Sequence, residues 1–249
     1  MTIKIDVTTD LLTHLEFLVT ARMGAFFRWQ QRWYGKRFIR NRSLHKARQI
    51  GADYYFTLEA LQDACLTGRN KIFIEPAPSD PDEEFVSFGW AYMLHHAGIK
   101  TESTDHKVTK YHITLSNGAN IYFLPDNHQG WAGMVGDVYL SEWAYHSDPS
   151  HSFQILQGVT CHKKWRRTLY SSRSSQDNAE TVETRFLSAG QLFSEPAFYD
   201  VVTHGFELYQ FDKHQGLTMD KLIQIRSTLP DQEYRELYLC QQPIYSGGE

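Results

Sequence analysis

The stretch from Lys46 to Asp53 constrains the fold of this chain more than any other feature. It reads Lys-Ala-Arg-Gln-Ile-Gly-Ala-Asp and lies between a short strand-like run and a helical pattern. A phosphate-binding loop occupies such a place in nucleotide-binding proteins, where backbone N–H groups and a Lys hold phosphates and a hydroxyl holds Mg²⁺. The segment therefore indicates an unusual form of such a loop.

This loop departs from the common pattern at two positions. Ala52 follows Gly51 where the pattern has Lys, and Asp53 stands where the hydroxyl belongs. Lys46, at the other end of the loop, is the available replacement cation. The helix predicted over residues 52–67 directs the positive end of its dipole at the phosphates.

Strand-like and helical segments alternate along the rest of the chain. Continuous apolar runs at Lys71–Ile74 and Val138–Leu140 are typical of buried parallel strands. Lys107–Leu115 and Asn120–Leu124 alternate apolar and polar residues around an Asn-Gly turn, which predicts an antiparallel hairpin. We expect a P-loop NTPase-like α/β fold, with a mainly parallel central sheet, flanking helices and this hairpin.

Helical patterns flank these strands. One or two helices are predicted over residues 10–33, and two more over 218–228 and 231–241. Another is predicted to begin at a cap at residue 79 or 80, to carry the following acidic residues in its first turn, and to run through Phe85 to Gly98. We expect a single domain over 1–249, with a basic, aromatic helical lead-in (1–40) and an α/β core with C-terminal helices (41–249).

Basic residues are concentrated although the net charge is −4. No acidic residue lies between Phe17 and Ala52, where Lys and Arg alternate with aromatic residues. Such a segment suits contact with DNA or nucleotide phosphates, and the alternative is a solvated helix face with core aromatics. A second basic run over 162–167, on the edge opposite the loop, is a candidate DNA or partner contact. The candidate nucleic-acid contacts are Arg28, Arg32, Arg37, Lys163 and Lys164.

Composition excludes several classes of protein. The three cysteines show no C-x-x-C spacing, so neither a disulfide framework nor a zinc ribbon is indicated. The longest apolar runs are too short to span a bilayer, and the amino terminus lacks a signal-peptide layout. We expect a cytoplasmic protein without membrane contact.

Taken in chain order, several motifs together resemble the ATPase domain of tailed-bacteriophage terminase large subunits, the motors that package DNA into capsids. The resemblance runs over residues 27–242. It implies ATP and Mg²⁺ as ligands, double-stranded DNA as a partner, and a phage or prophage origin in a bacterial host. The portal, procapsid or small terminase subunit are further implied partners. The motifs are Gln30–Trp33, Lys46–Ala52, Asn117–Leu124, Gly136–Tyr139 and Thr168–Ser175.

The resemblance also implies roles for individual residues. Glu142 corresponds to the base that activates water, and Arg48 to a loop arginine that stabilises transition-state charge. Ser171 and Ser172 resemble the coupling motif that senses the nucleotide state. Gln30 corresponds to an adenine contact. The remaining implied nucleotide contacts are Lys46, Gln49, Gly51, Ala52 and Asp53.

Two departures from the family concern the magnesium ion. The family has a hydroxyl after Gly-Ala and an Asp before the catalytic Glu, whereas this chain has Asp53 and Ser141. One interpretation is an exchange that keeps one carboxylate and one hydroxyl at the metal. The other is independent decay of both positions.

Two functions are compatible with these patterns. The first is a terminase-like ATPase domain that binds ATP and Mg²⁺, hydrolyses ATP weakly and acts on double-stranded DNA. The second is a non-catalytic terminase mimic that binds a packaging partner or DNA. The chain ends without an acidic nuclease domain, so we expect no nuclease activity. We also expect a monomer or weak oligomer that oligomerises only on a partner.

Overall fold

The computed structural model describes residues 1–20, 28–80, 82–100, 110–172, 193–194 and 219–238. The strands in these ranges are β1 (Thr2–Ile5), β2 (Asn41–His45), β3 (Lys71–Glu75), β4 (Tyr111–Leu115), β5 (Asn120–Pro125), β6 (Asp137–Ser141), β7 (Arg167–Ser171) and β8 (Phe193–Ser194). The helices are α1 (Thr9–Thr20), α2 (Arg28–Tyr34), α3 (Ala52–Thr67), α4 (Phe88–His96), α5 (Pro149–Val159), α8 (Met219–Thr228) and α9 (Asp231–Tyr238), with a 3-10 turn, η1 (Trp143–Tyr145). No helix in these ranges is long and apolar enough to cross a membrane.

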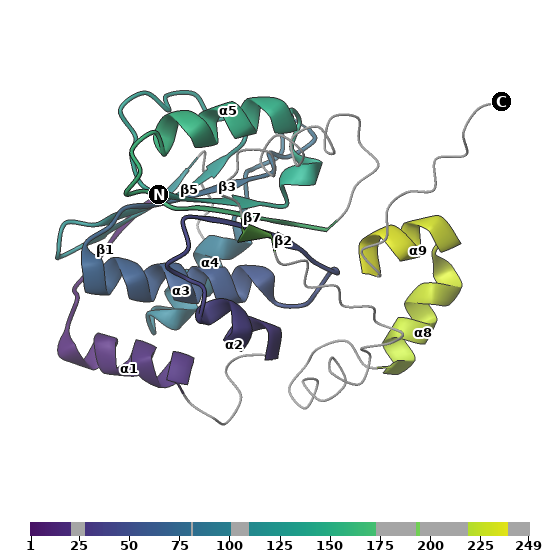
Figure 1. The fold of residues 1–249 in the computed structure, drawn as a ribbon, viewed down its shortest axis with the longest axis horizontal. Helices are drawn as coiled ribbons and strands as arrows, with labels where there is room; N and C mark the ends of the chain where they lie inside the picture. The colour runs from purple at the N-terminus through teal and green to yellow at the C-terminus, as the bar shows by residue number, and fades with distance from the viewer. Residues whose placement is uncertain (21–27, 81, 101–109, 173–192, 195–218, 239–249) are drawn as a thin grey trace.

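The strands form one sheet in the order β1-β4-β5-β3-β6-β7-β2-β8. From β5 to β8 all neighbouring strands are parallel, whereas β4 runs antiparallel to β5. Figure 1 shows α1 to α4 on one face of the sheet and α5 on the other. The predicted α/β fold, with a mainly parallel sheet and an antiparallel hairpin, is confirmed.

Helix α3 follows the loop of residues 46–51, which we call the phosphate loop for its predicted role, and has the bounds predicted from sequence. It ends at Gly68, whose φ of 68° is left-handed and therefore suits a residue without Cβ. Trp29 and Trp33 of α2 pack edge-on against Tyr55 and Phe56 of α3, with ring centroids 5.4 and 6.0 Å apart. Both Trp side chains are only 1% exposed. These aromatics of the lead-in segment therefore belong to the core, as one of the two interpretations predicted.

Three stacked rings align the centre of the sheet. Phe73 of β3 stacks between Phe123 of β5 and Tyr139 of β6, with ring centroids 4.7 and 4.6 Å apart. Each such pair contributes about 0.5–1.5 kcal/mol beyond simple burial. The stack keeps β5, β3 and β6 in register, so the carboxyl ends of β3 and β6 lie at the same edge.

Asp137, within the predicted Gly136–Tyr139 motif, begins β6 at the opposite edge. Its carboxylate pairs with Lys71 at 2.7 Å, with Arg166 at 3.0 Å and with Arg69. Burial alone would raise the pKa of Asp137, but these three cations hold it well below its usual range. The residue therefore stabilises the sheet and lies away from the phosphate loop.

Helix α4 begins later than the sequence pattern predicted. Its cap is Ser87, whose hydroxyl accepts the Trp90 N–H at 3.0 Å and donates to Glu75 at 3.0 Å. The predicted cap at residues 79–80 is wrong, and so is the placement of the acidic residues in the first turn. The buried Glu75 carboxyl, a tertiary partner, fixes where the helix starts.

Candidate active site

The phosphate loop connects β2 to α3 and is anchored by two apolar residues. Ala47 and Ile50 are 0% and 1% exposed, so the loop is fixed to the core between its polar positions. Gln49 and Gly51 have φ values of 61° and 73°. Loops that mix left-handed and right-handed residues form concave arrays of N–H groups that bind anions. This backbone geometry fits a phosphate.

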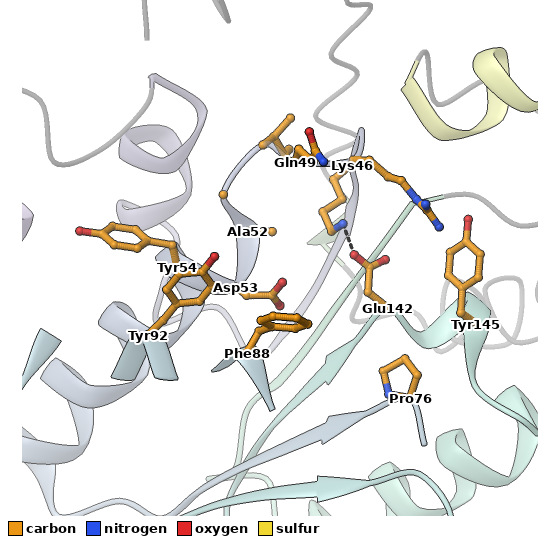
Figure 2. A pocket seen from close by; sticks show the side chains of 13 residues that line it. Lys46, Gln49, Ala52, Asp53, Tyr54, Pro76, Phe88, Tyr92, Glu142 and Tyr145 are labelled. Carbon is orange, nitrogen blue, oxygen red and sulfur yellow. Dashed lines mark hydrogen bonds and ion pairs between the residues drawn. The ribbon is translucent and has the colours of Figure 1, made fainter. Parts of the chain in front are cut away.

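A cavity of about 840 Å³ opens in front of the loop. Figure 2 shows Lys46 and Glu142 facing each other in it, and Tyr54, Phe88 and Tyr92 on another wall. The volume falls within the roughly 300–1,000 Å³ of typical small-molecule sites. The sequence-predicted residues that line it are Lys46, Arg48, Gln49, Gly51, Ala52, Asp53 and Glu142.

Glu142 follows β6 directly, and its carboxylate is held from two sides. Lys46 Nζ forms an ion pair with Oε1, the dashed line in Figure 2. Oε2 accepts the Ser172 N–H at 3.1 Å and the hydroxyls of Ser171 and Ser172 at 3.3 Å. Burial alone would raise the pKa of Glu142, but Lys46 and the Ser172 amide lower it. The carboxylate is therefore ionised at neutral pH and contacts both predicted coupling residues.

Asp53 and Ser141, the predicted metal ligands, are in direct contact. The Ser141 hydroxyl donates to Asp53 Oδ1 at 3.0 Å. Burial raises the pKa of Asp53. The charge of Lys46 lowers this pKa, and the charge of Glu142 raises it. Within the described residues, no three His, Cys, Asp or Glu side chains are grouped to hold a metal ion. Because Mg²⁺ binds through one or two carboxylates plus water and phosphate oxygens, one carboxylate with one hydroxyl fits it.

Arg48 lies at the boundary between this cavity and a second one of about 420 Å³. Its guanidinium carbon is 5.6 Å from the ring centroid of Tyr145. Its backbone N–H donates to the carbonyl oxygen of Leu237 in α9 at 2.9 Å. That amide is engaged within the protein, so the predicted role of Arg48 depends on its side chain.

Gln30 of α2 supports the phosphate loop through a hydrogen bond to its backbone. Its side chain is 1% exposed and donates to the Gly51 carbonyl oxygen at 2.9 Å. The same oxygen accepts the Tyr55 N–H at 3.1 Å in the first turn of α3. Gln30 thus ties α2 to the loop, and its contact with adenine stays a prediction.

The two basic segments meet at the sheet edge opposite the phosphate loop. The backbone N–H of Arg167 donates to the Arg40 carbonyl at 2.6 Å, and Arg166 donates to the Arg37 carbonyl at 2.9 Å. Lys163 and Lys164 are exposed beside them. We call Arg37, Arg40, Lys163, Lys164 and Arg167 the basic face.

The remaining predicted nucleic-acid contacts lie on α2. Arg32 is exposed there. Arg28 begins the same helix, and its side chain falls outside the described part of the structure. The structure therefore unites three of the five predicted contacts in one surface.

Several cavity residues escaped the sequence analysis. Phe88 and Tyr92 are 70% and 39% exposed and stand four residues apart on α4, so they share one helix face. That spacing was a usable signal. Tyr170, which lies outside the cavity lining, is buried on β7 and hydrogen-bonded to Asp53; it had no such signal because its contact is purely tertiary.

Comparison with known proteins identifies similar sequences in phages. A family model described as "Terminase large subunit, T4likevirus-type, N-terminal" matches residues 44–248. The probable terminase, ATPase subunit, of Haemophilus phage HP1 (strain HP1c1) is 36% identical over 135 residues. The terminase, ATPase subunit, of Escherichia phage P2 is 30% identical over 152 residues. These matches cover 54% and 60% of this chain but only 21% and 24% of the relatives.

Solved structures show the same fold at low sequence identity. The large terminase ATPase domain of Thermus Phage P74-26 superposes with a TM-score of 0.50, at 14% identity, covering 80% of this chain and 86% of that chain. A mutant form of that domain gives a TM-score of 0.51, again at 14% identity, with 80% and 87% covered.

Proposed function

The chain belongs to the family of T4likevirus-type terminase large subunits, matching its N-terminal part, and we propose that it is the ATP-hydrolysing domain of a motor that packages viral DNA. The observation that carries the proposal is the convergence of Lys46, Asp53 and Glu142 on one cavity in front of the phosphate loop. These three side chains come from separate segments of the chain. Their meeting at the carboxyl edge of a parallel sheet is where nucleotide sites of α/β proteins lie.

Phosphoryl transfer to water requires neutralised phosphate charge and an oriented nucleophile. Lys46 and the left-handed loop supply positive charge and N–H donors for the phosphates. A Mg²⁺ ion held by Asp53 and Ser141 would neutralise further charge on the phosphate oxygens. Glu142, ionised and fixed by Ser171 and Ser172, accepts the proton of the attacking water.

The Lys46–Glu142 ion pair gives the proposed reaction an order of events. Without nucleotide, Lys46 is engaged with the carboxylate that is to act as base. Phosphate oxygens compete for the same ammonium group and leave Glu142 held by the two serines. Nucleotide binding thereby releases the base from its neutralising partner.

ATP binding and turnover test the proposal directly. We expect Mg²⁺-dependent ATP binding by calorimetry and slow phosphate release that double-stranded DNA accelerates. Chelation of the metal should abolish turnover. Absence of ATP binding under all of these conditions would instead support the non-catalytic terminase mimic.

DNA is the polymer proposed for the basic face. Two segments that are separated in sequence place five cationic side chains on one surface, and such a cluster of positive charge suits a duplex backbone. The buried Trp29 and Trp33 cannot stack on bases, so the contact depends on charge. The affinity of such a contact falls linearly with salt on logarithmic axes.

Removing two of these charges is expected to flatten the salt dependence. Lys163→Gln combined with Lys164→Gln should lower the steepness of the log–log plot by about 2 units, since each phosphate contact contributes about 0.9. Fluorescence anisotropy with duplex DNA at several salt concentrations measures it. The charge-matched control is Lys4→Gln with Lys110→Gln, at the β1–β4 end of the sheet. Equal affinity at low and moderate salt in the starting protein would rule out phosphate contacts.

A further inference from the structure

Glu142 has an unusual backbone conformation. Its φ of 45° and ψ of 39° are left-handed, although the residue carries a Cβ. This conformation is unfavourable for residues other than glycine, so the surroundings must hold it. It directs the side chain off the end of β6 and toward the loop, where 27% of it remains exposed.

His146 holds the peptide group just before this residue. Its Nε2 lies 2.8 Å from the Ser141 carbonyl oxygen, and its Nδ1 lies 2.8 Å from the Ser152 hydroxyl of α5. A carbonyl oxygen can only accept, so Nε2 carries the proton and Nδ1 accepts from Ser152. The imidazole is fully buried and both ring nitrogens are engaged, which fixes its orientation.

Asp126 holds the other end of the same turn. Its Oδ2 accepts the backbone N–H of Ser147 at 2.7 Å and the Ser147 hydroxyl at 2.8 Å. Its Oδ1 accepts the Ala77 N–H at 2.8 Å, just beyond β3. Residues 143–147 are therefore fixed both to β6 and to the neighbouring strand end.

We infer that His146 is a positioning residue for Glu142. By binding the Ser141 carbonyl it fixes the peptide plane from which Glu142 projects, and so aims the carboxylate at Lys46 and Ser172. The inference rests on the proposed role of Glu142 as the catalytic base. It assigns a function to a buried histidine that lies outside the cavity lining.

Replacing His146 with Leu and with Gln tests this assignment. His146→Leu removes the Nε2–H donor, and we expect kcat for ATP to fall about 10-fold while the Kd for ATP changes less than about 2-fold. His146→Gln restores an N–H donor at similar reach and should recover most of kcat. Equal losses in both variants, or parallel losses of kcat and ATP affinity, would overturn the inference.

Amide hydrogen exchange supplies a second readout that does not need turnover. Residues 141–146 should exchange faster in His146→Leu and not in His146→Gln. The matched control is His96→Leu, a buried histidine whose Nε2 lies 3.0 Å from the Tyr54 carbonyl oxygen. It should lower Tm comparably without faster exchange over 141–146.

The two readouts separate failure of the inference from failure of the proposed function. If the starting protein does not hydrolyse ATP, the proposed role of Glu142 as the base is contradicted, whatever the exchange data show. Unchanged exchange in a folded His146→Leu protein would overturn the positioning role even if ATP is hydrolysed. If that variant does not fold, Ser152→Ala decides: faster exchange over 141–146 supports the inference, and unchanged exchange overturns it.

Discussion

Replacing Glu142 with Gln is expected to lower ATP turnover about 1,000-fold while ATP still binds. The amide keeps the size of the carboxylate but cannot accept the proton of the attacking water. It also removes the negative partner of Lys46, which leaves that ammonium available to phosphate. We therefore expect tighter ATP binding than in the starting protein. Phosphate release and calorimetry, measured on the same preparation, give both quantities.

Glu75 offers a matched control for this substitution. Its carboxyl group is buried near Asp53, and burial followed by repulsion from Asp53 raises its pKa to about 8. It is therefore mostly protonated at neutral pH, and Glu75→Gln replaces one neutral group with another. Turnover should stay close to that of the starting protein. If Glu142→Gln and Glu75→Gln were equally inactive, the loss of activity would not be specific to Glu142. The result would then give no support for Glu142 as the base.

The pH dependence of turnover follows from the same carboxylate. The folded-state pKa of Glu142 is lowered from the usual 4.5, so the ionised form is present throughout neutral pH. The value of kcat/KM, which reports the nucleotide-free protein, is lost only as pH falls through this lowered pKa. We expect no loss of kcat/KM from this group between about pH 6 and 8.

Exchanging Asp53 and Ser141 is the second substitution with a large expected effect. Asp53→Thr alone leaves two hydroxyls and no carboxylate, and Ser141→Asp alone places two carboxylates in contact. Each single change should weaken Mg²⁺-dependent ATP binding, by up to about 150-fold. The double change should restore the starting affinity, because one carboxylate and one hydroxyl again share the site.

A double-mutant cycle measures the coupling between these positions. The hydrogen bond of 3.0 Å between the two side chains predicts an interaction energy of about 0.5–3 kcal/mol. Titrations of all four forms with ATP, with and without Mg²⁺, give the four binding free energies that the cycle compares. Additive effects would show that the two residues do not share an ion, and would favour independent decay.

The parts of the fold that sequence predicted are those with local signals. Gly68 ended α3 where a left-handed residue was expected, and the Asn-Gly turn gave the β4–β5 hairpin. Helix α5 was missed although Asp148 caps it and Pro149 starts it, a pattern readable from the chain. The start of α4 was not readable, because Glu75 fixes it across space.

The residues of the candidate site also fall into two groups, those with a local sequence signal and those placed only by tertiary contacts. Loop residues and strand ends were predictable because parallel strands bring their carboxyl ends to one edge of the sheet. The pairing of Lys46 with Glu142 joins residues 96 positions apart, so no spacing rule indicates it. His146 and Asp126 were missed for the same reason. Their partners include backbone groups, which leave no residue-type pattern in the sequence.

The hydrogen bond between Arg48 and Leu237 connects the last described helix to the proposed nucleotide site. Three side chains of α9 pack into the core of the protein: Tyr234, Leu237 and Tyr238. One N–H···O bond of 2.9 Å joins α9 to the backbone of the phosphate loop. We therefore expect a displacement of α9 to shift the loop proposed to bind phosphates, and a change in the loop to shift the helix.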